Sequence, residues 1–232
     1  NGKKQKLKLC DFMVENIQAR GRGSRLLPAI ASAWDAVYSC NGNKAEASIS
    51  YFTMYGDGTG FFAPIGDLWK WQVYELARYM QEAIFQKPIL QDIIDLPPSA
   101  ELSPAQDVEK GLGDPLVYPY HDHLFAVWAD WINPAGPDKL LRWYMEGTLG
   151  TKINCEDPGL VYRLFPTPQD FIQDLEKWWT LYTGLATVKK QQMPPILTVD
   201  CYPYRRKPFS IQTTYFPLEY IKLKEQILGQ NK

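Results

Sequence analysis

The sequence predicts a helix-rich α/β protein with few strands. Apolar side chains recur at spacings of three and four residues in several long stretches, which is typical of amphipathic helices. Only two short runs, residues 36–40 and 196–201, have the composition of strands. Parallel strands need helices on both faces, so this low count suggests that the rest of a sheet lies outside the 232 residues.

The composition excludes several classes of partner. The chain carries 25 Lys and Arg against 26 Asp and Glu, a net charge of −1, so it offers no broad basic surface to nucleic acid or an anionic membrane. No stretch reaches the roughly 18–20 continuous apolar residues of a membrane helix. The four cysteines are too far apart for a zinc site, and we expect reduced thiols in a cytoplasmic protein.

The first predicted helix covers residues 11–34, where apolar residues follow the helical spacing. Gly21, Gly23 and Pro28 interrupt the pattern, because glycine and proline both weaken a helix interior. We therefore expect a kink, or two shorter helices.

A capping box predicts the start of the next helix, with Asn43 as the N-cap and Glu46 three residues later. At such a turn Glu46 is either a capping acid or a Mg²⁺ ligand, and composition does not choose between them. Residues 55–60 read as a flexible glycine-rich loop. After it, Asp67 is expected to cap a strong amphipathic helix.

From residue 118 the chain is predicted to be a mostly helical tail, so we expect two parts, residues 1–117 and residues 118–232. Thr167 begins one tail helix, and a final helix follows at residues 218–228. The first of these carries an aromatic stripe that either packs into the core or forms a subunit contact. The stripe consists of Phe171, Leu175, Trp178, Trp179 and Tyr182.

Two motifs give only weak signals. The glycines of residues 56–60 have the wrong spacing for a dinucleotide fingerprint. The His-Asp-His run at residues 121–123 places its histidines on different sides of a helix, and the chain has no third histidine. A polar helix start is the favoured interpretation of that run.

Cationic side chains give a stronger hint of an anion site. Arg20, Arg22 and Arg25 lie within six residues and suit a phosphate or carboxylate, although a solvated basic helix face is the alternative. Lys70 is expected at the third position of the helix capped by Asp67, where the macrodipole favours an acid. A cation in that position is consistent with a bound anion.

Five segments, in order and at roughly the expected spacing, resemble NAD+ synthetase. They are residues 15–22 (Glu-Asn-Ile-Gln-Ala-Arg-Gly-Arg), 42–46 (Gly-Asn-Lys-Ala-Glu), 55–58 (Tyr-Gly-Asp-Gly), 64–70 (Pro-Ile-Gly-Asp-Leu-Trp-Lys) and 98–102 (Pro-Ser-Ala-Glu-Leu). The tail, from Pro119 onward, resembles the extension of glutamine-dependent bacterial members. The resemblance implies the C-terminal portion of an adenine-nucleotide alpha hydrolase-like, Rossmann-like synthetase domain with a parallel sheet, followed by the helical extension.

The same resemblance implies a ligase. Such an enzyme uses ATP and Mg²⁺ to adenylate the nicotinate carboxylate of deamido-NAD+, and ammonia from glutamine then displaces AMP to give NAD+. A glutaminase domain of the same full-length chain and a homo-oligomer are implied partners. The alternative is a noncatalytic binding or assembly module descended from that enzyme.

The resemblance also assigns roles to matching residues. Phe12, Asn16, Arg20 and Asp57 match positions that contact deamido-NAD+, and Arg22, Lys70 and Ser99 match the ATP-binding side. Glu46 matches a Mg²⁺ ligand, and Lys70 and Glu46 are the expected catalytic residues. Ser99 stands where Thr is common.

The sequence departs from the family pattern in two ways. Met54 replaces a lysine and Phe61 stands near an expected aspartate, so the resemblance does not extend to those two contacts. The Ser-Gly-Gly-x-Asp-Ser run that wraps pyrophosphate is absent from these 232 residues, and we expect it upstream of Asn1. We therefore expect a fragment that is inactive by itself.

Overall fold

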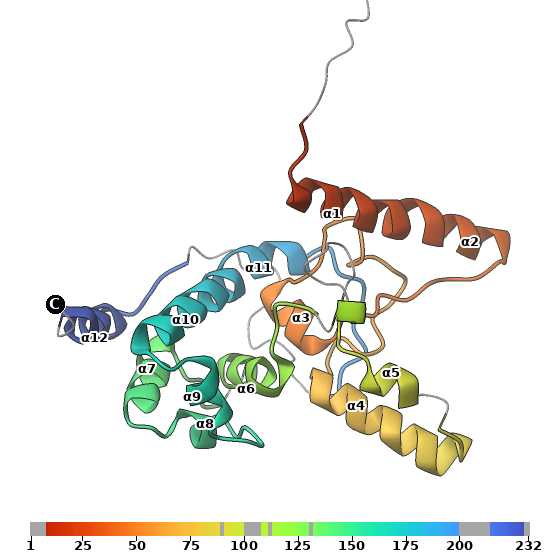
Figure 1. The fold of residues 1–232 in the computed structure, drawn as a ribbon. Helices are drawn as coiled ribbons and strands as arrows, with labels where there is room; N and C mark the ends of the chain where they lie inside the picture. The colour runs from red at the N-terminus through yellow and green to blue at the C-terminus, as the bar shows by residue number, and fades with distance from the viewer. Residues whose placement is uncertain are drawn as a thin grey trace, which may run out of the picture.

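The computed structural model describes residues 8–88, 91–99, 108–110, 113–129, 132–199 and 214–229. These residues form helices joined by loops (Figure 1). In chain order the elements are α1 (Asp11–Gly21), the π-helical turn η1 (Arg22–Leu26), α2 (Leu27–Ala33), α3 (Lys44–Ile49), α4 (Lys70–Tyr79), the π-helical turn η2 (Met80–Phe85), α5 (Gln91–Asp95), the 3₁₀ turn η4 (Val108–Lys110), α6 (Tyr118–Ala129), α7 (Pro137–Met145), α8 (Leu149–Lys152), α9 (Leu160–Leu164), α10 (Pro168–Thr183), α11 (Leu185–Lys190) and α12 (Leu218–Gly229). The helix-rich character of the prediction is confirmed.

The predicted first helix forms, and its interruption is a π-helical widening. α1, η1 and α2 follow one another without a break and cross the top of the molecule as one rod (Figure 1). At the widening, a Cβ on Gly23 would lie 1.9 Å from the carbonyl oxygen of Gly56. Only glycine permits this close approach, which brings the rod against the loop of residues 51–60.

Neither predicted strand forms within the described residues. Residues 36–40 are extended, but their links to the neighbouring loop are two backbone hydrogen bonds, from the Phe61 N–H to the Tyr38 oxygen (2.8 Å) and from the Cys40 N–H to the Phe62 oxygen (2.9 Å). The 196–201 segment makes one isolated parallel bridge, at Ile196, and its last two residues lie outside the described part. A β-ladder requires a second strand as partner, but each of these segments pairs only with a loop. The parallel sheet therefore remains a prediction.

The predicted capping box of α3 is confirmed. Asn43 Oδ1 accepts the N–H of Glu46 at 3.1 Å, and Glu46 Oε2 accepts the N–H of Asn43 at 2.9 Å. This reciprocal pair fixes both the start of the helix and the Glu46 carboxylate.

The prediction that Asp67 caps the following helix is wrong. Asp67 is buried and pairs with the buried Lys44 at 2.8 Å, because a carboxylate removed from water requires a cation nearby. α4 instead begins at Lys70, with Trp69 as its N-cap residue. Lys70 is therefore the first residue of its helix and not the third, but it still lies at the positive end of the dipole.

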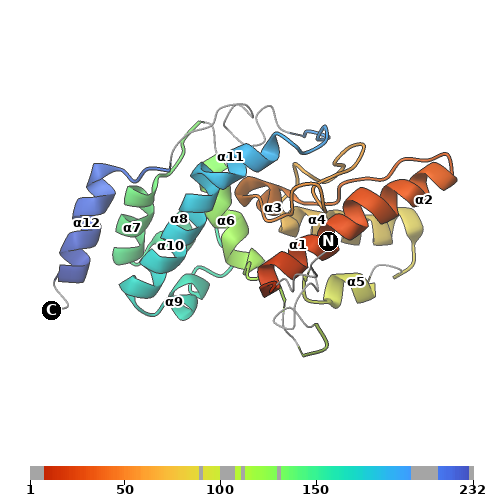
Figure 2. The same ribbon diagram turned by 90° about the horizontal axis from the view of Figure 1, so that it is seen from above.

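The main core lies among the tail helices, which stand beside one another in Figure 2. All five residues of the aromatic stripe on α10 are buried there, with Trp178 at 1% and Trp179 at 5% exposure. Core packing is thus the correct interpretation of the stripe, and it leaves none of these side chains for a subunit contact. Ala45, Ile49 and Trp69 join the same core from the first part of the chain, so α3 and the start of α4 pack on the tail.

In the part of the chain that the structure describes, none of the helices has the length and apolar character needed to cross a bilayer.

Candidate functional site

A cavity of about 320 Å³ lies where η1, the start of α3, the loop of residues 51–60 and the first residue of α4 meet. Five residues that the sequence assigned to nucleotide or metal contacts line it. They are Arg22, Glu46, Asp57, Lys70 and Ser99. Residues from segments far apart in sequence thus converge on one space.

Glu46 is held firmly at this cavity. Its Oε1 accepts the Asn43 Nδ2–H at 2.8 Å and the Tyr118 hydroxyl at 2.9 Å, while Oε2 accepts the Asn43 backbone N–H. Burial raises the pKa of Glu46, and the nearby Lys70 ammonium and these hydrogen bonds oppose that rise. The carboxylate is therefore fixed in place, with one lone pair of Oε2 left by these contacts.

A second carboxylate, Asp114, lies beside the first. The Tyr118 hydroxyl is 2.9 Å from Glu46 Oε1 and 3.2 Å from Asp114 Oδ2, and the Tyr51 hydroxyl donates to Asp114 Oδ1 at 3.3 Å. Burial raises the pKa of Tyr118 far above its usual range, and the negative charges of Glu46 and Asp114 add smaller increases. Tyr118 is therefore a neutral donor that holds the two acids close together.

The sequence reasoning missed Asp114, Tyr51 and Tyr118. Their contacts join residues far apart in the chain. Tyr51 and Asp114 are separated by 63 residues, and Glu46 and Tyr118 by 72. No helical or strand period relates such positions. The one available signal is that Asp114 and Tyr118 lie in a segment rich in glycine and proline, residues 111–119.

The donor set at this cavity suits Mg²⁺, which prefers oxygen ligands. Glu46 and Asp114 present carboxylates on one side of the space. No group of three or more Asp, Glu, His or Cys side chains is arranged to hold a metal within the described residues. Mg²⁺ is usually held by one or two carboxylates together with waters and substrate phosphates.

Lys70 supplies positive charge to the same cavity. Its Nζ lies 5.3 Å from the ring centroid of Tyr118 and 5.6 Å from that of Tyr74. These aromatic faces stabilise a cation and restrict its movement. Below the side chain, the carboxylate of Asp122 in α6 accepts the N–H of Trp71, the next residue of α4, at 3.1 Å.

The loop of residues 51–60 closes another side of the cavity. Asp57 Oδ1 accepts the Thr53 N–H at 2.7 Å, which holds the loop in a tight turn. The Tyr38 hydroxyl and Thr59 Oγ1 both donate to the Gly23 oxygen, at 2.9 and 3.3 Å. The glycine-rich loop is thus anchored to η1, which places Arg22 at the cavity.

The residues expected at the nicotinate lie on α1 and do not line the cavity. Phe12 is 71% exposed, and Asn16 donates through Nδ2 to the Phe12 oxygen at 2.7 Å. Arg20 Nε donates to the Met54 oxygen at 3.1 Å, which places its guanidinium against the loop that carries Asp57. Their role in substrate contact remains a prediction.

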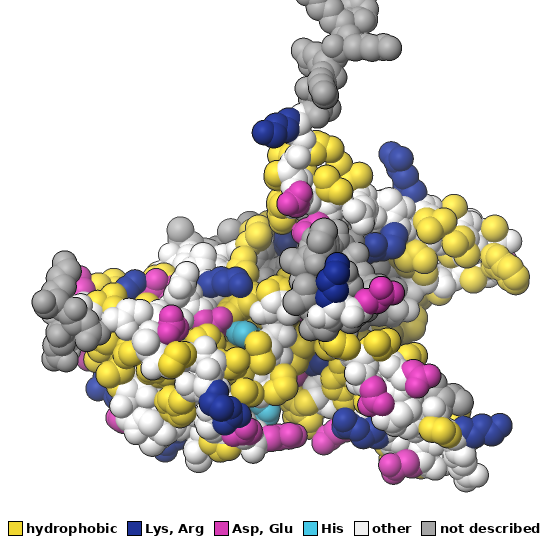
Figure 3. Space-filling model, in the orientation of Figure 1, with side chains coloured by type: hydrophobic (Ala, Val, Ile, Leu, Met, Phe, Trp, Pro, Cys, Tyr) yellow, Lys and Arg dark blue, Asp and Glu magenta, His cyan; other side chains and the backbone are white. Residues whose placement is uncertain are grey.

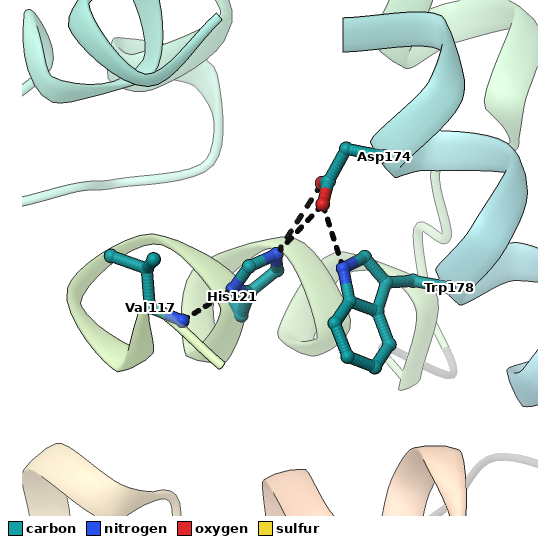
Figure 4. A network of polar contacts seen from close by, with 4 residues as sticks. All are labelled: Val117, His121, Asp174 and Trp178. Atoms are coloured by element: carbon teal, nitrogen blue, oxygen red, sulfur yellow. Dashed lines mark hydrogen bonds and ion pairs between the residues drawn. The ribbon is translucent and has the colours of Figure 1, made fainter. Parts of the chain in front are cut away.

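The His-Asp-His run lies near the start of α6, as the sequence favoured, but its first two residues, His121 and Asp122, are buried. His121 Nδ1 accepts the Val117 N–H at 2.8 Å, and its Nε2 lies 3.3 Å from Asp174 Oδ2 (Figure 4). Asp174 also accepts the indole N–H of Trp178 at 2.8 Å. The next histidine, His123, stacks on Trp71 of α4 instead. The two histidines therefore serve separate contacts.

Comparison with known proteins places the first half of the chain in one family. Residues 2–131 match the family described as NAD synthase. A glutamine-dependent NAD(+) synthetase of Acinetobacter baylyi is 37% identical over 118 residues, which are 50% of this chain and 20% of that protein. One of Xylella fastidiosa is 35% identical over 144 residues, or 62% of this chain and 26% of that protein.

A solved structure shares the fold. The glutamine-dependent NAD(+) synthetase of Cytophaga hutchinsonii superposes with a TM-score of 0.59 at 18% identity, over 94% of this chain and 30% of that one. The chain thus spans about a fifth to a quarter of the length of the two curated relatives described above.

Proposed function

The chain belongs to the NAD synthase family, and we propose on that premise that it forms the nucleotide-binding cavity of a glutamine-dependent NAD+ synthetase. The reaction would be ATP-dependent adenylation of the nicotinate carboxylate of deamido-NAD+, followed by attack of ammonia to give the amide. The single observation that supports this most is the convergence of Arg22, Glu46, Lys70 and Ser99 on one cavity.

The charges at the cavity suit adenylation. Negative charge develops on the α-phosphate and on the departing pyrophosphate, and cations fixed in advance stabilise it. Lys70 and Arg22 would contact these phosphates, and the Ser99 hydroxyl would donate to one of their oxygens. Because Lys70 is held over two aromatic rings, little reorganisation would be needed when charge develops.

Mg²⁺ would be held by Glu46, with Asp114 as the neighbouring carboxylate, and by the ATP phosphates. Bound there, the ion would neutralise phosphate charge as a Lewis acid. The single hydroxyl hydrogen of Tyr118 lies within reach of both carboxylates, 2.9 Å from Glu46 Oε1 and 3.2 Å from Asp114 Oδ2 by its oxygen, and so keeps them close together.

Deamido-NAD+ would extend from the cavity along α1. Arg20 supports this direction, because its contact with the Met54 oxygen places it at the edge of the loop that also carries Asp57. Phe12 and Asn16 precede Arg20 by two helical turns and one turn, so they would meet the nicotinate end. Asn16 and Arg20, four residues apart, would converge on its carboxylate.

The full-length protein would also supply ammonia from a glutaminase domain and would form a homo-oligomer. Exposed apolar side chains on three helices of this chain support the need for further protein surface. Ile17 and Ile30 of the α1–α2 rod are 54% and 48% exposed, and Leu76 of α4 is 42% exposed. Figure 3 shows apolar side chains on the projecting end of the rod.

A noncatalytic binding or assembly module is the second candidate. It is favoured by one observation, the absence of Ser-Gly-Gly-x-Asp-Ser from the sequence. The encoded sequence upstream of Asn1 separates the two candidates. A reading frame that continues into that motif and a hydrolase domain supports the enzyme, whereas a start codon at this point supports the module.

An activity assay tests the proposed reaction. The full-length protein that contains this chain should form NAD+ from deamido-NAD+, ATP and Mg²⁺ with either glutamine or ammonium as the nitrogen source. The 232-residue chain alone should form none, because it lacks the pyrophosphate loop. NAD+ synthesis by the isolated chain, or none by the full-length protein, would contradict the proposal.

A further inference from the structure

The helix that carries Lys70 begins without an acceptor of its own. The N-cap residue of α4 is Trp69, and an indole offers no oxygen to the free N–H groups of the first turn. Gln72 accepts only the N–H of Trp69 itself, at 2.9 Å. The first N–H groups of a helix have no partner within it, so an acceptor comes from another element or from water.

Asp122 of α6 is that acceptor. Its Oδ2 accepts the Trp71 N–H at 3.1 Å, across 51 residues of sequence. The residue is completely buried, and its Oδ1 has no hydrogen-bond partner in the described part of the chain. A buried carboxylate with an unpartnered oxygen costs stability. Stability alone therefore does not account for an acid at this position.

Lys70 is the group that this contact affects most. Its backbone forms the turn that Asp122 caps, and its ammonium lies over the ring of Tyr118, which is one turn earlier than Asp122 on α6. α6 thus contacts both the backbone and the side chain at the start of α4. A change in either contact moves the ammonium relative to Glu46.

We propose that Asp122 is a positioning residue for Lys70, which it holds at the wall of the cavity by capping α4. The proposal rests on the function proposed above, in which Lys70 contacts phosphates. The carboxylate also places negative charge at the positive end of the helix, where it offsets the opposed charge of Lys70. Asp122 would act without touching substrate.

The proposal includes a pH dependence. Burial raises the pKa of Asp122 to about 7, against the lowering effect of the Trp71 and Lys70 backbone N–H groups. The charged groups that face it are Glu46 from α3 and Lys70 from α4, together with the phenol of Tyr74. Its neighbours on α6, His121 and His123, contact Asp174 of α10 and Trp71 of α4 respectively. Below about pH 7 the carboxylate takes up a proton, and the charged cap is lost.

A double-mutant cycle in the full-length protein tests the proposal. The variants are Asp122→Asn, Lys70→Ala and the double variant, with Asp138→Asn as the matched control because Asp138 lies in the first turn of α7, away from the cavity. We expect Asp122→Asn to lower kcat about tenfold or more at pH 8 and to flatten the acid limb of the pH profile. On the Lys70→Ala background it should cause no further loss.

Several results would overturn the proposal. One is an unchanged kcat and pH profile for Asp122→Asn. Another is a fall in kcat on adding Asp122→Asn to Lys70→Ala that equals the fall it causes in the wild-type protein. A variant that fails to fold would also overturn it, because the proposal gives Asp122 a role in the placement of Lys70 and none in folding.

A second measurement does not depend on activity. The side-chain nitrogen resonance of Lys70, followed by NMR, should shift in Asp122→Asn and stay in place in Asp138→Asn. If the wild-type protein makes no NAD+, the proposed function fails, and this resonance still decides the placement of Lys70. An unchanged resonance in Asp122→Asn would overturn the positioning role.

Discussion

At the scale of single residues, Glu46 has two expected roles, as a capping acid and as a Mg²⁺ ligand, and the structure shows the capping contacts. It completes the capping box of α3 and also lines the cavity beside Asp114. Glutamine at this position can still complete a capping box but carries no charge for a metal. Substitution by Gln therefore separates the capping role from metal binding.

We predict that Glu46→Gln changes the unfolding midpoint little and weakens divalent-metal binding in the presence of ATP by at least about tenfold. Mn²⁺ binding to the full-length protein, followed by electron paramagnetic resonance, measures this. Asp170→Asn is the matched control, because Asp170 completes the capping box of α10 away from the cavity. Equal metal affinity in both variants would leave Glu46 with the capping role alone.

Asp122 gives a prediction about stability and pH. Its pKa is about 7 in the folded chain, whereas the ordinary value, which the unfolded chain has, is 3.8. Between these two pH values the folded state therefore binds more protons than the unfolded state. Stability should therefore fall as pH rises from about 4 to about 7, and Asp122→Asn removes this loss. Between pH 5 and pH 8 the difference between wild type and variant should change by about 2–3 kcal/mol.

Urea unfolding of both proteins at the two pH values measures this difference directly. Other titrating groups, Glu46 included, are common to the two proteins and cancel in the comparison. Parallel pH dependences would show that Asp122 ionises normally in the folded chain.

At the scale of elements, the sequence predicted correctly those helices and caps that depend on contacts between residues close together in the chain. The box of Asn43 and Glu46 and the helical run of residues 11–34 depend on neighbours three or four residues away, and both are present. Asp67 is a residue type that commonly caps helices, but its carboxylate forms an ion pair with Lys44 instead. The acceptor at α4 is Asp122, 51 residues beyond Trp71. A single sequence gives no signal for either of these contacts.

The two predicted strands do not form within the described residues, for a related reason. A strand is stable only when a neighbouring strand completes its hydrogen bonds, and composition alone does not supply the neighbour. Within the described residues, Tyr38 and Cys40 bond to a loop, and Ile196 forms a single bridge with Ala63. For the site, the motifs located the cavity residues Glu46 and Lys70, whereas its second acid and its tyrosines came only from the fold.

The contact between η1 and the loop of residues 51–60 can be tested by comparing two glycine variants, one inside the contact and one outside it. A Cβ on Gly23 would meet the Gly56 oxygen at 1.9 Å, whereas a Cβ on Gly21 would have nothing within 4 Å. We predict that Gly23→Ala costs about 1–3 kcal/mol, because the rod and loop must separate. Gly21→Ala should be neutral or stabilise by up to about 1 kcal/mol. Chemical denaturation compares the two, and equal effects would contradict the close packing.

At the scale of the whole molecule, the chain buries its tail well and its first half incompletely. The tail core contains Trp128 and Trp178 at 1% exposure each, whereas Trp34 at the end of the rod is 80% exposed. An apolar surface of this kind is costly in water and is usually covered by protein. We therefore predict that the chain associates into a dimer or larger species.

Light scattering at tens of micromolar measures this association. Ile17→Glu and Ile30→Glu, on the exposed rod, should weaken it, while Val188→Glu on α11, 36% exposed, is the control. A strict monomer, or association that these rod variants leave unchanged, would contradict the prediction.

We propose that Lys70 and its cavity carry out the chemistry of NAD+ formation in the full-length protein. The most direct test is the rate of NAD+ formation by the full-length protein carrying Lys70→Ala, against Lys139→Ala, a lysine in the first turn of α7. We expect Lys70→Ala to lower kcat by about 10²–10³-fold, with an unfolding midpoint equal to or slightly above that of wild type. Lys139→Ala should retain wild-type activity. A well-folded Lys70→Ala protein that forms NAD+ at the wild-type rate would contradict the account.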